Sequence, residues 1–131
     1  MIDKKQTSIC SELDLAGIDT GACIKGLSDE VKDLFYIFND NNSTRIGRHS
    51  LQELTIQHSC ISSQHCLILR NADNSYSIMD LDSKNGVLVN GVRVKLSKIT
   101  DQDIIQLGPV KLLFFTGASV YHEAKKKYNL K

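Results

Sequence analysis

Short apolar runs alternate with polar turn residues over most of the chain. From Leu34 to Phe115 the runs are LFYIF, TRIG, ELTI, HCLILR, YSIMDL, VLV, VRV, DIIQL and VKLLFF, separated by segments such as NDNNS, NADNS, KNG, NG and GP. Many of these residues are β-branched or aromatic, and the runs return roughly every eight to twelve residues, which is typical of an antiparallel sandwich or barrel. No helical period interrupts them. The pattern therefore predicts an all-β domain.

The two ends of the chain do not follow this pattern. Residues 1–30 are polar and contain scattered glycines, which predicts a tail with a short helix around ACIKGL or SDEVKDL. Residues 117–131 include the charged stretch ASVYHEAKKKYNLK, which predicts a terminal tail or helix. The domain itself is expected over residues 31–116.

Composition limits the function classes. A chain of 131 residues that is 41% hydrophobic supports one compact domain. Sixteen Lys and Arg against fifteen Asp and Glu give a net charge of +1, so the chain lacks the basic field that non-specific nucleic-acid binding uses. No apolar stretch reaches the length of a signal peptide or the roughly twenty residues of a membrane span. We therefore expect a soluble intracellular protein that binds neither nucleic acid nor membrane directly.

The four cysteines do not form a recognisable metal or disulfide pattern. Cys10, Cys23, Cys60 and Cys66 match neither a C-x-x-C pair nor a zinc template. We expect free thiols, with Cys66 in the core and Cys60 in a loop. The sequence predicts no metal and no cofactor.

Two Asn-Gly pairs lie close together in KNGVLVNGVRV. Asn85-Gly86 and Asn90-Gly91 bracket one short strand, and Asn-Gly is the strongest local signal for a tight turn with positive φ. The second pair predicts an ordinary hairpin. The first pair places Lys84 and Asn85 at an exposed loop tip.

Ser62 and His65 at the head of HCLILR raise the question of catalysis. They stand three positions apart at the entrance of a strand, without a Gly-x-Ser-x-Gly elbow and without an identifiable orienting acid. A nucleophile and its base are therefore not expected here, and the sequence predicts no enzyme.

Five short motifs follow one another along the chain: Gly47-Arg48, Ser62-Ser63-Gln64-His65, Ser83-Lys84-Asn85-Gly86, Asn90-Gly91 and a final Gly108. This order resembles the signature of the forkhead-associated (FHA) domain over roughly residues 34–115. The resemblance implies a two-sheet β-sandwich of about eleven short strands whose loops at one end recognise a phosphothreonine peptide. The texture looks most like the FHA modules of ring-finger ubiquitin ligases and DNA-damage signalling proteins, which favours a nuclear over a cytoplasmic location.

The resemblance also assigns roles to individual residues. A phosphate carries about −1.5 to −2 charges and three acceptor oxygens, so its site needs a cation and several donors. Arg48 supplies the planar fork, Ser62 a hydroxyl, and Asn85 a hydrogen bond to the peptide backbone. Two positions depart from the family pattern. Ser63 stands where many relatives have Arg and offers a neutral donor, and Lys84 stands where many have Ser or Thr and offers a compensating charge.

The remaining motif residues are expected to support the site. Gly47, His65, Gly86 and Asn90 would shape the loops, with His65 buried beneath them to hold the Ser62 turn. The expected partner is a phosphothreonine protein, bound by a monomer or weak dimer. The rival hypothesis is a phosphate-independent scaffold or dimerisation domain of the same fold.

Overall fold

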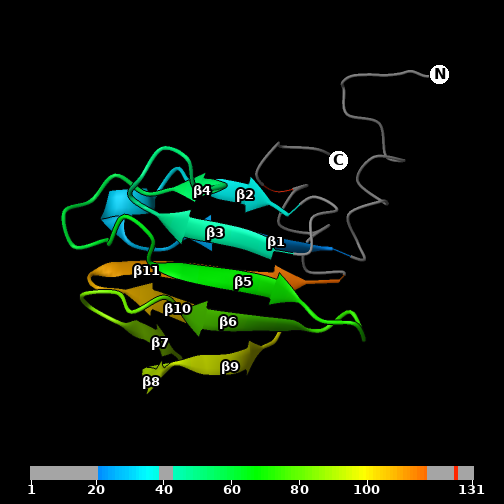
Figure 1. Cartoon of the computed structure of the whole chain (residues 1–131). Helices are drawn as coiled ribbons and strands as arrows, with labels where there is room; N and C mark the ends of the chain where they lie inside the picture. Colours follow the sequence, from blue (N-terminus) through cyan, green and yellow to red (C-terminus); the bar gives the residue numbers. More distant parts are fainter. Residues whose placement is uncertain (1–20, 39–42, 118–125, 127–131) are drawn as a thin grey trace.

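The computed structural model of the protein describes residues 21–38, 43–117 and 126. Within these ranges, eleven short strands form two sheets that pack face to face (Figure 1). The predicted all-β sandwich is thereby confirmed. None of the described helical residues belongs to a helix long and apolar enough to cross a membrane. Residues 1–20 of the tail predicted over residues 1–30, and nearly all of the C-terminal segment, lie outside the described residues.

The larger sheet has the strand order β2-β1-β11-β10-β7-β8. Its strands are β1 (Ala22–Gly26), β2 (Phe35–Ile37), β7 (Val87–Val89), β8 (Val92–Val94), β10 (Asp103–Leu107) and β11 (Val110–Thr116). All its paired neighbours run antiparallel. The order is not sequential, so the sheet joins both ends of the domain through the β1–β11 pair.

The smaller sheet has the order β4-β3-β5-β6-β9. Its strands are β3 (Ser43–Gly47), β4 (Leu54–Thr55), β5 (Cys66–Arg70), β6 (Tyr76–Asp80) and β9 (Leu96–Ile99). Strands β3 and β4 pair in parallel, and the other neighbours run antiparallel. A parallel pair needs a connection that doubles back, and this connection carries Arg48.

The core forms where the inward faces of the two sheets meet. Every second side chain of β6 is buried, and in β5 the same alternation buries Cys66 and Ile68, as the pleat of a strand requires. Tyr76 of β6 and Phe114 of β11 make an edge-to-face contact with ring centroids 5.4 Å apart, so an aromatic pair joins the sheets. Phe38 lies 6.1 Å from both rings and completes the cluster.

The helix expected over ACIKGL is wrong. This segment is strand β1, which pairs with β2 on one side and β11 on the other. Ala22, Cys23 and Ile24 are fully buried, so tertiary pairing overrides the weak local propensity. A Cβ on Gly26 would lie 1.7 Å from the Val31 carbonyl oxygen, so this glycine lets the following turn fold back. The domain therefore begins before residue 31.

The short helix expected around SDEVKDL is present as a 3-10 turn, Asp29–Val31. Its Val31 side chain is buried in the core, and the turn leads from β1 into β2.

The hairpin expected at Asn90-Gly91 is also confirmed. It joins β7 to β8, and both residues have the positive φ that such a tight turn requires, 51° and 84°.

Four connections gather at one end of the sandwich, at the left in Figure 1. They are the segments 48–53, 56–65, 81–86 and 108–109. Four of the five motif elements fall on these connections or at their edges. The fold therefore brings together residues that are up to about sixty positions apart in sequence.

Candidate functional site

Arg48 follows β3 directly and is tied to the loop that contains Ser62. Its backbone N–H donates to the Ser62 carbonyl at 2.9 Å, and its Nε donates to the Ile61 carbonyl at 3.0 Å. A guanidinium carries five N–H donors in one plane, so the Nε bond leaves the terminal nitrogens available. The side chain is exposed and makes no ion pair among the described residues. Arg48 is thus an oriented cation with unused donors.

Gly47 permits this close approach. A Cβ at position 47 would lie 2.2 Å from the Ser63 carbonyl oxygen and 2.8 Å from the Ser63 carbonyl carbon. No backbone atom can accommodate such a contact, so any side chain here would displace the Ser62–Ser63 segment. The predicted supporting role of Gly47 has a steric basis.

Ser62 links two of the site loops through its hydroxyl group. Its Oγ accepts a hydrogen bond from the Lys84 backbone N–H at 2.9 Å. A hydroxyl has one proton and two lone pairs, so accepting this bond fixes the oxygen and leaves the proton free to donate. The hydroxyl donates no hydrogen bond to any of the described residues. The Ser62 hydroxyl is therefore an oriented donor on the exposed side of the loops.

His65 lies fully buried beneath these loops. Its Nδ1 accepts the Ser62 backbone N–H at 3.1 Å, which requires the ring proton to be on Nε2. Nε2 then donates to the Gly86 carbonyl at 2.8 Å. Both ring nitrogens are occupied by backbone groups of two different loops. The ring contacts the backbone of Ser62 and not its hydroxyl, so it is not arranged as a base for a Ser62 nucleophile.

Asn85 is half-buried, whereas the sequence predicted an exposed loop tip. Its Nδ2 donates to the Cys60 carbonyl at 2.8 Å, which ties the 81–86 loop to the 56–65 loop. The side-chain carbonyl of Asn85 keeps its acceptor capacity for a backbone N–H. Gly108 borders the same place, since its missing Cβ would lie 3.1 Å from the Cys60 Cβ and 3.7 Å from Asn85 Nδ2.

The 81–86 loop is held by a short chain of hydrogen bonds that sequence reasoning missed. The Gly86 N–H donates to Ser83 Oγ at 2.9 Å, and the Ser83 N–H donates to Asp80 Oδ1 at 3.0 Å. Burial opposes the ionisation of Asp80, but the hydrogen bonds from Ser83 and the Lys95 ammonium outweigh it and lower its pKa. Asp80 therefore stays ionised and fixes the start of the loop that carries Lys84 and Asn85.

Lys84 and Ser63 are both exposed. The Lys84 ammonium makes no ion pair among the residues that the structure describes, so its charge is not neutralised. The Ser63 carbonyl accepts the His49 N–H at 3.3 Å, which orients its backbone while the side chain faces solvent. Both residues border the Arg48–Ser62 surface.

Asn90 is not brought to the site. Its Nδ2 donates to Asp103 Oδ1 at 2.9 Å, and its Oδ1 accepts the Ile104 N–H at 2.9 Å. These bonds attach the β7–β8 turn to β10. Asn90 lies at the end of β7 that points away from Gly86, so it supports the sheet rather than the site loops.

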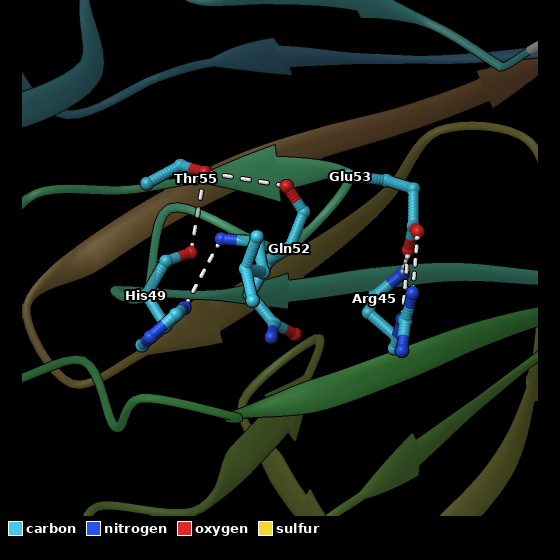
Figure 2. A network of polar contacts seen from close by, with 6 residues as sticks. Arg45, His49, Gln52, Glu53 and Thr55 are labelled. Carbon is cyan, nitrogen blue, oxygen red and sulfur yellow. Dashed lines mark hydrogen bonds and ion pairs between the residues drawn. The ribbon is translucent and has the colours of Figure 1, made fainter.

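A second network, shown in Figure 2, holds the loop after Arg48. Glu53 accepts bonds from the Arg45 backbone N–H at 2.7 Å, from Nε at 3.1 Å and from Nη2 at 2.9 Å. The side-chain bond from Arg45, helped by its backbone N–H, lowers the pKa of Glu53 to about 2. The Thr55 hydroxyl lies within hydrogen-bond distance of the carbonyls of His49, at 3.4 Å, and Gln52, at 3.3 Å, which share its single proton. Because Glu53 is ionised at neutral pH, its bonds to Arg45 hold together the two ends of the 48–53 loop, which carries Arg48.

The described residues contain no group of three or more His, Cys, Asp or Glu side chains that could hold a metal ion. Cys66 is buried and Cys60 is partly exposed, as the sequence predicted. Burial, with a smaller contribution from the Asp80 charge, raises the pKa of the Cys66 thiol, so it stays protonated.

A comparison with models of known protein families identifies the family of this domain. Residues 44–108 match the family model of the FHA domain. The matched region begins in β3, ends at Gly108 and contains the three site loops 48–53, 56–65 and 81–86. The chain therefore belongs to the FHA domain family.

Curated relatives agree with this assignment. The chain is 32% identical over 79 residues to an oxoglutarate dehydrogenase inhibitor of Corynebacterium jeikeium, covering 60% of this chain and 54% of the relative. It is 30% identical over 78 residues to the glycogen accumulation regulator GarA of Mycobacterium tuberculosis, covering 60% of this chain and 48% of the relative. The chain thus spans about half the length of the curated relatives it matches.

Solved structures show the same fold. The FHA domain of the CT664 protein from Chlamydia trachomatis superposes with a TM-score of 0.67 at 26% identity, covering 72% of this chain and 96% of that one. The N-terminal FHA domain of Rad53p from S. cerevisiae, solved with a phosphothreonine peptide, superposes with a TM-score of 0.68 at 16% identity, covering 78% and 98%. The second likeness is one of fold alone.

Proposed function

We propose that this chain binds phosphothreonine peptides through Arg48, Ser62, Lys84 and Asn85. FHA domains are phosphothreonine-peptide recognition modules that use basic residues to bind the phosphate. The observation that carries the proposal is the oriented pair of unused donors, the Arg48 terminal nitrogens and the Ser62 hydroxyl proton, on one connected set of loops. The Lys84 ammonium adds charge beside them, and the Asn85 carbonyl is available to a peptide N–H.

The loops are preorganised for this ligand. Each donor is already held by bonds to another loop, so binding requires little further ordering of the protein. Charge-assisted hydrogen bonds to a phosphate are roughly twice as strong as neutral ones. A phosphate placed between Arg48 and Ser62 would therefore gain most of its binding energy at a small entropic cost.

We further propose that the chain has no catalytic activity of its own. The two nitrogens of His65 are both committed to backbone groups, which removes the nearest base from Ser62. Two of the curated relatives are named as a regulator and an inhibitor. A phosphorylation-dependent regulator that acts by binding another protein is consistent with both observations.

The cellular setting suggested by the sequence finds no support among the curated relatives. These relatives are bacterial, and their names indicate neither ring-finger ligases nor DNA-damage proteins. The nuclear location and the monomeric or weakly dimeric state remain predictions. A phosphate-independent scaffold of the same fold remains the alternative, and it requires no unused donors at Arg48 and Ser62.

Peptide discrimination tests the proposal. The protein is titrated by fluorescence anisotropy with matched peptides that carry phosphothreonine, threonine, phosphoserine, aspartate or glutamate at one position, starting from a degenerate phosphothreonine library. We expect clear binding of the phosphothreonine peptide, no measurable binding of the threonine peptide and much weaker binding of the aspartate and glutamate peptides, because one planar carboxylate offers less charge and fewer acceptors. Equal binding of all five peptides would contradict phosphate recognition.

A further inference from the structure

Arg93 lies against the site loops although no motif drew attention to it. It sits in the middle of β8, where it pairs with Leu88 of β7. Its side chain reaches back to the start of β7, since a Cβ on Gly86 would lie 2.8 Å from the Arg93 Cζ and 2.9 Å from its Nε and Nη2. The guanidinium therefore rests on the backbone of Gly86, the residue directly after Asn85.

Gly86 makes room for this arrangement. With φ of +78° and no side chain, it offers a flat stretch of backbone to the planar guanidinium. The carbonyl of the same residue accepts the bond from His65 Nε2 at 2.8 Å. The buried histidine fixes Gly86, and Gly86 in turn gives Arg93 a defined place at the edge of the site.

The charge of Arg93 has no acidic partner among the described residues. The ion pairs there involve Arg45 with Glu53, Lys95 with Asp80 and Asp82, and Lys98 with Asp73. Lys95 thus engages the acids of the 81–86 loop and its start, which leaves Arg93 exposed and unneutralised. Lys84 precedes Asn85 in the chain, and Arg48 binds the Ile61 carbonyl, next to the Cys60 carbonyl that Asn85 binds. With Arg93 against Gly86, three cations without an ion pair among the described residues lie near Asn85.

We propose that Arg93 is a specificity-determining residue that reads an acidic side chain flanking the phosphothreonine. This inference rests on the proposed function and names a feature of its ligand. A peptide whose backbone contacts Asn85 passes beside Gly86, and an extended peptide advances about 3.3 Å per residue. Side chains within a few positions of the phosphothreonine therefore come within reach of the Arg93 guanidinium, which offers parallel donors to a carboxylate.

The expected effect of Arg93 on peptide affinity is small because its side chain is exposed to solvent. An exposed ion pair contributes about 0.2 to 1 kcal/mol, which corresponds to a change in affinity of up to about fivefold. The preference should weaken as salt is added, since such pairs are screened. Arg93 is therefore expected to select among phosphopeptides rather than to make binding possible.

The test uses a short peptide with a central phosphothreonine among alanines and serines. Glutamate, glutamine or lysine is placed at each nearby position in turn, and dissociation constants are measured for the parent, Arg93→Gln and Arg93→Glu. Lys98→Gln serves as the matched control, because it removes one exposed positive charge from β9, beside the Asp73 turn. Thermal melts verify that each variant is folded.

We expect the parent to bind the best glutamate peptide about two- to fivefold more tightly than its glutamine counterpart. Arg93→Gln should remove this preference, Arg93→Glu should reverse it in favour of lysine, and Lys98→Gln should keep it. An acid preference that survives in Arg93→Gln overturns the proposal. So does an equal loss for all phosphopeptides in Arg93→Gln, which would make Arg93 a phosphate contact. A parent that binds the phosphopeptides without preference refutes only the role of Arg93, whereas a parent that binds none of them refutes the proposed function as well.

Discussion

Replacing Arg48 with alanine should lower the affinity for a phosphothreonine peptide at least about thirtyfold, because losing a charge-assisted contact in a partly desolvated site costs on the order of 2 to 5 kcal/mol. Arg48→Lys should recover only part of this loss, since an ammonium keeps the charge but not the parallel donors. Isothermal titration of the parent and both variants with the same peptide measures the effect.

The stability of Arg48→Ala needs a separate measurement. The side chain is exposed, but its Nε bond to the Ile61 carbonyl is lost, so unfolding should become easier by about 0.5 to 1.5 kcal/mol. Lys98→Ala is the matched control, and it should change neither affinity nor stability appreciably. An Arg48→Ala protein that binds a good phosphothreonine ligand as tightly as the parent would favour the scaffold hypothesis.

Replacing His65 with alanine should destabilise the fold by about 2 to 4 kcal/mol. The change leaves the Ser62 N–H and the Gly86 carbonyl without their partners and opens a cavity in a fully buried place. Chemical denaturation monitored by circular dichroism gives the free energy of unfolding. Peptide binding should weaken as a consequence, because the Ser62 and Lys84–Gly86 loops lose their common support.

Gln64→Ala is the control for this variant. Gln64 is the neighbour of His65 in the same loop and is exposed, so its removal should alter stability by less than about 0.5 kcal/mol. A His65→Ala protein that keeps the stability of the parent and yet loses all binding would show that His65 contacts the peptide directly.

Most strands could be predicted from the sequence because their apolar runs are long or strongly β-forming. Strand β1 could not, since ACIKG combines alanine, lysine and glycine and becomes a strand only through its pairing with β2 and β11. Strand β9, with the sequence LSKI, was missed for a similar reason. It is an edge strand in which the apolar Leu96 is exposed, so its sequence lacks the regular alternation of buried apolar and exposed polar residues.

The sequence predicts those residues of the candidate site that belong to one of the five short motifs. Arg48, Ser62, Lys84 and Asn85 lie on loops that meet, and His65 is buried as expected. Asn90 shares a motif with them but supports another part of the sheet. No local pattern points to Arg93 or to the Arg45–Glu53 pair, because their contacts depend on which strands become neighbours.

Asn85 shows why a motif residue is hard to interpret from sequence alone. Its amide nitrogen binds the Cys60 carbonyl, so an alanine there removes a bond between two loops as well as a peptide contact. A loss of affinity in such a variant has two causes that affinity alone does not separate. Variants of Arg48 and Arg93 address the ligand more directly.

If a phosphothreonine binds between the Arg48 and Ser62 loops, its phosphate must perturb the backbone there. An NMR titration of the labelled protein with a phosphothreonine peptide and with its unphosphorylated counterpart detects this perturbation residue by residue. We expect only the phosphorylated peptide to shift resonances, with the largest shifts on the backbone amides of Arg48, Ser62 and Lys84 and on the Arg48 side-chain Nε. Shifts that are the same for both peptides, or that are confined to the opposite end of the sandwich around Asn74 and Thr100, would contradict binding between these loops.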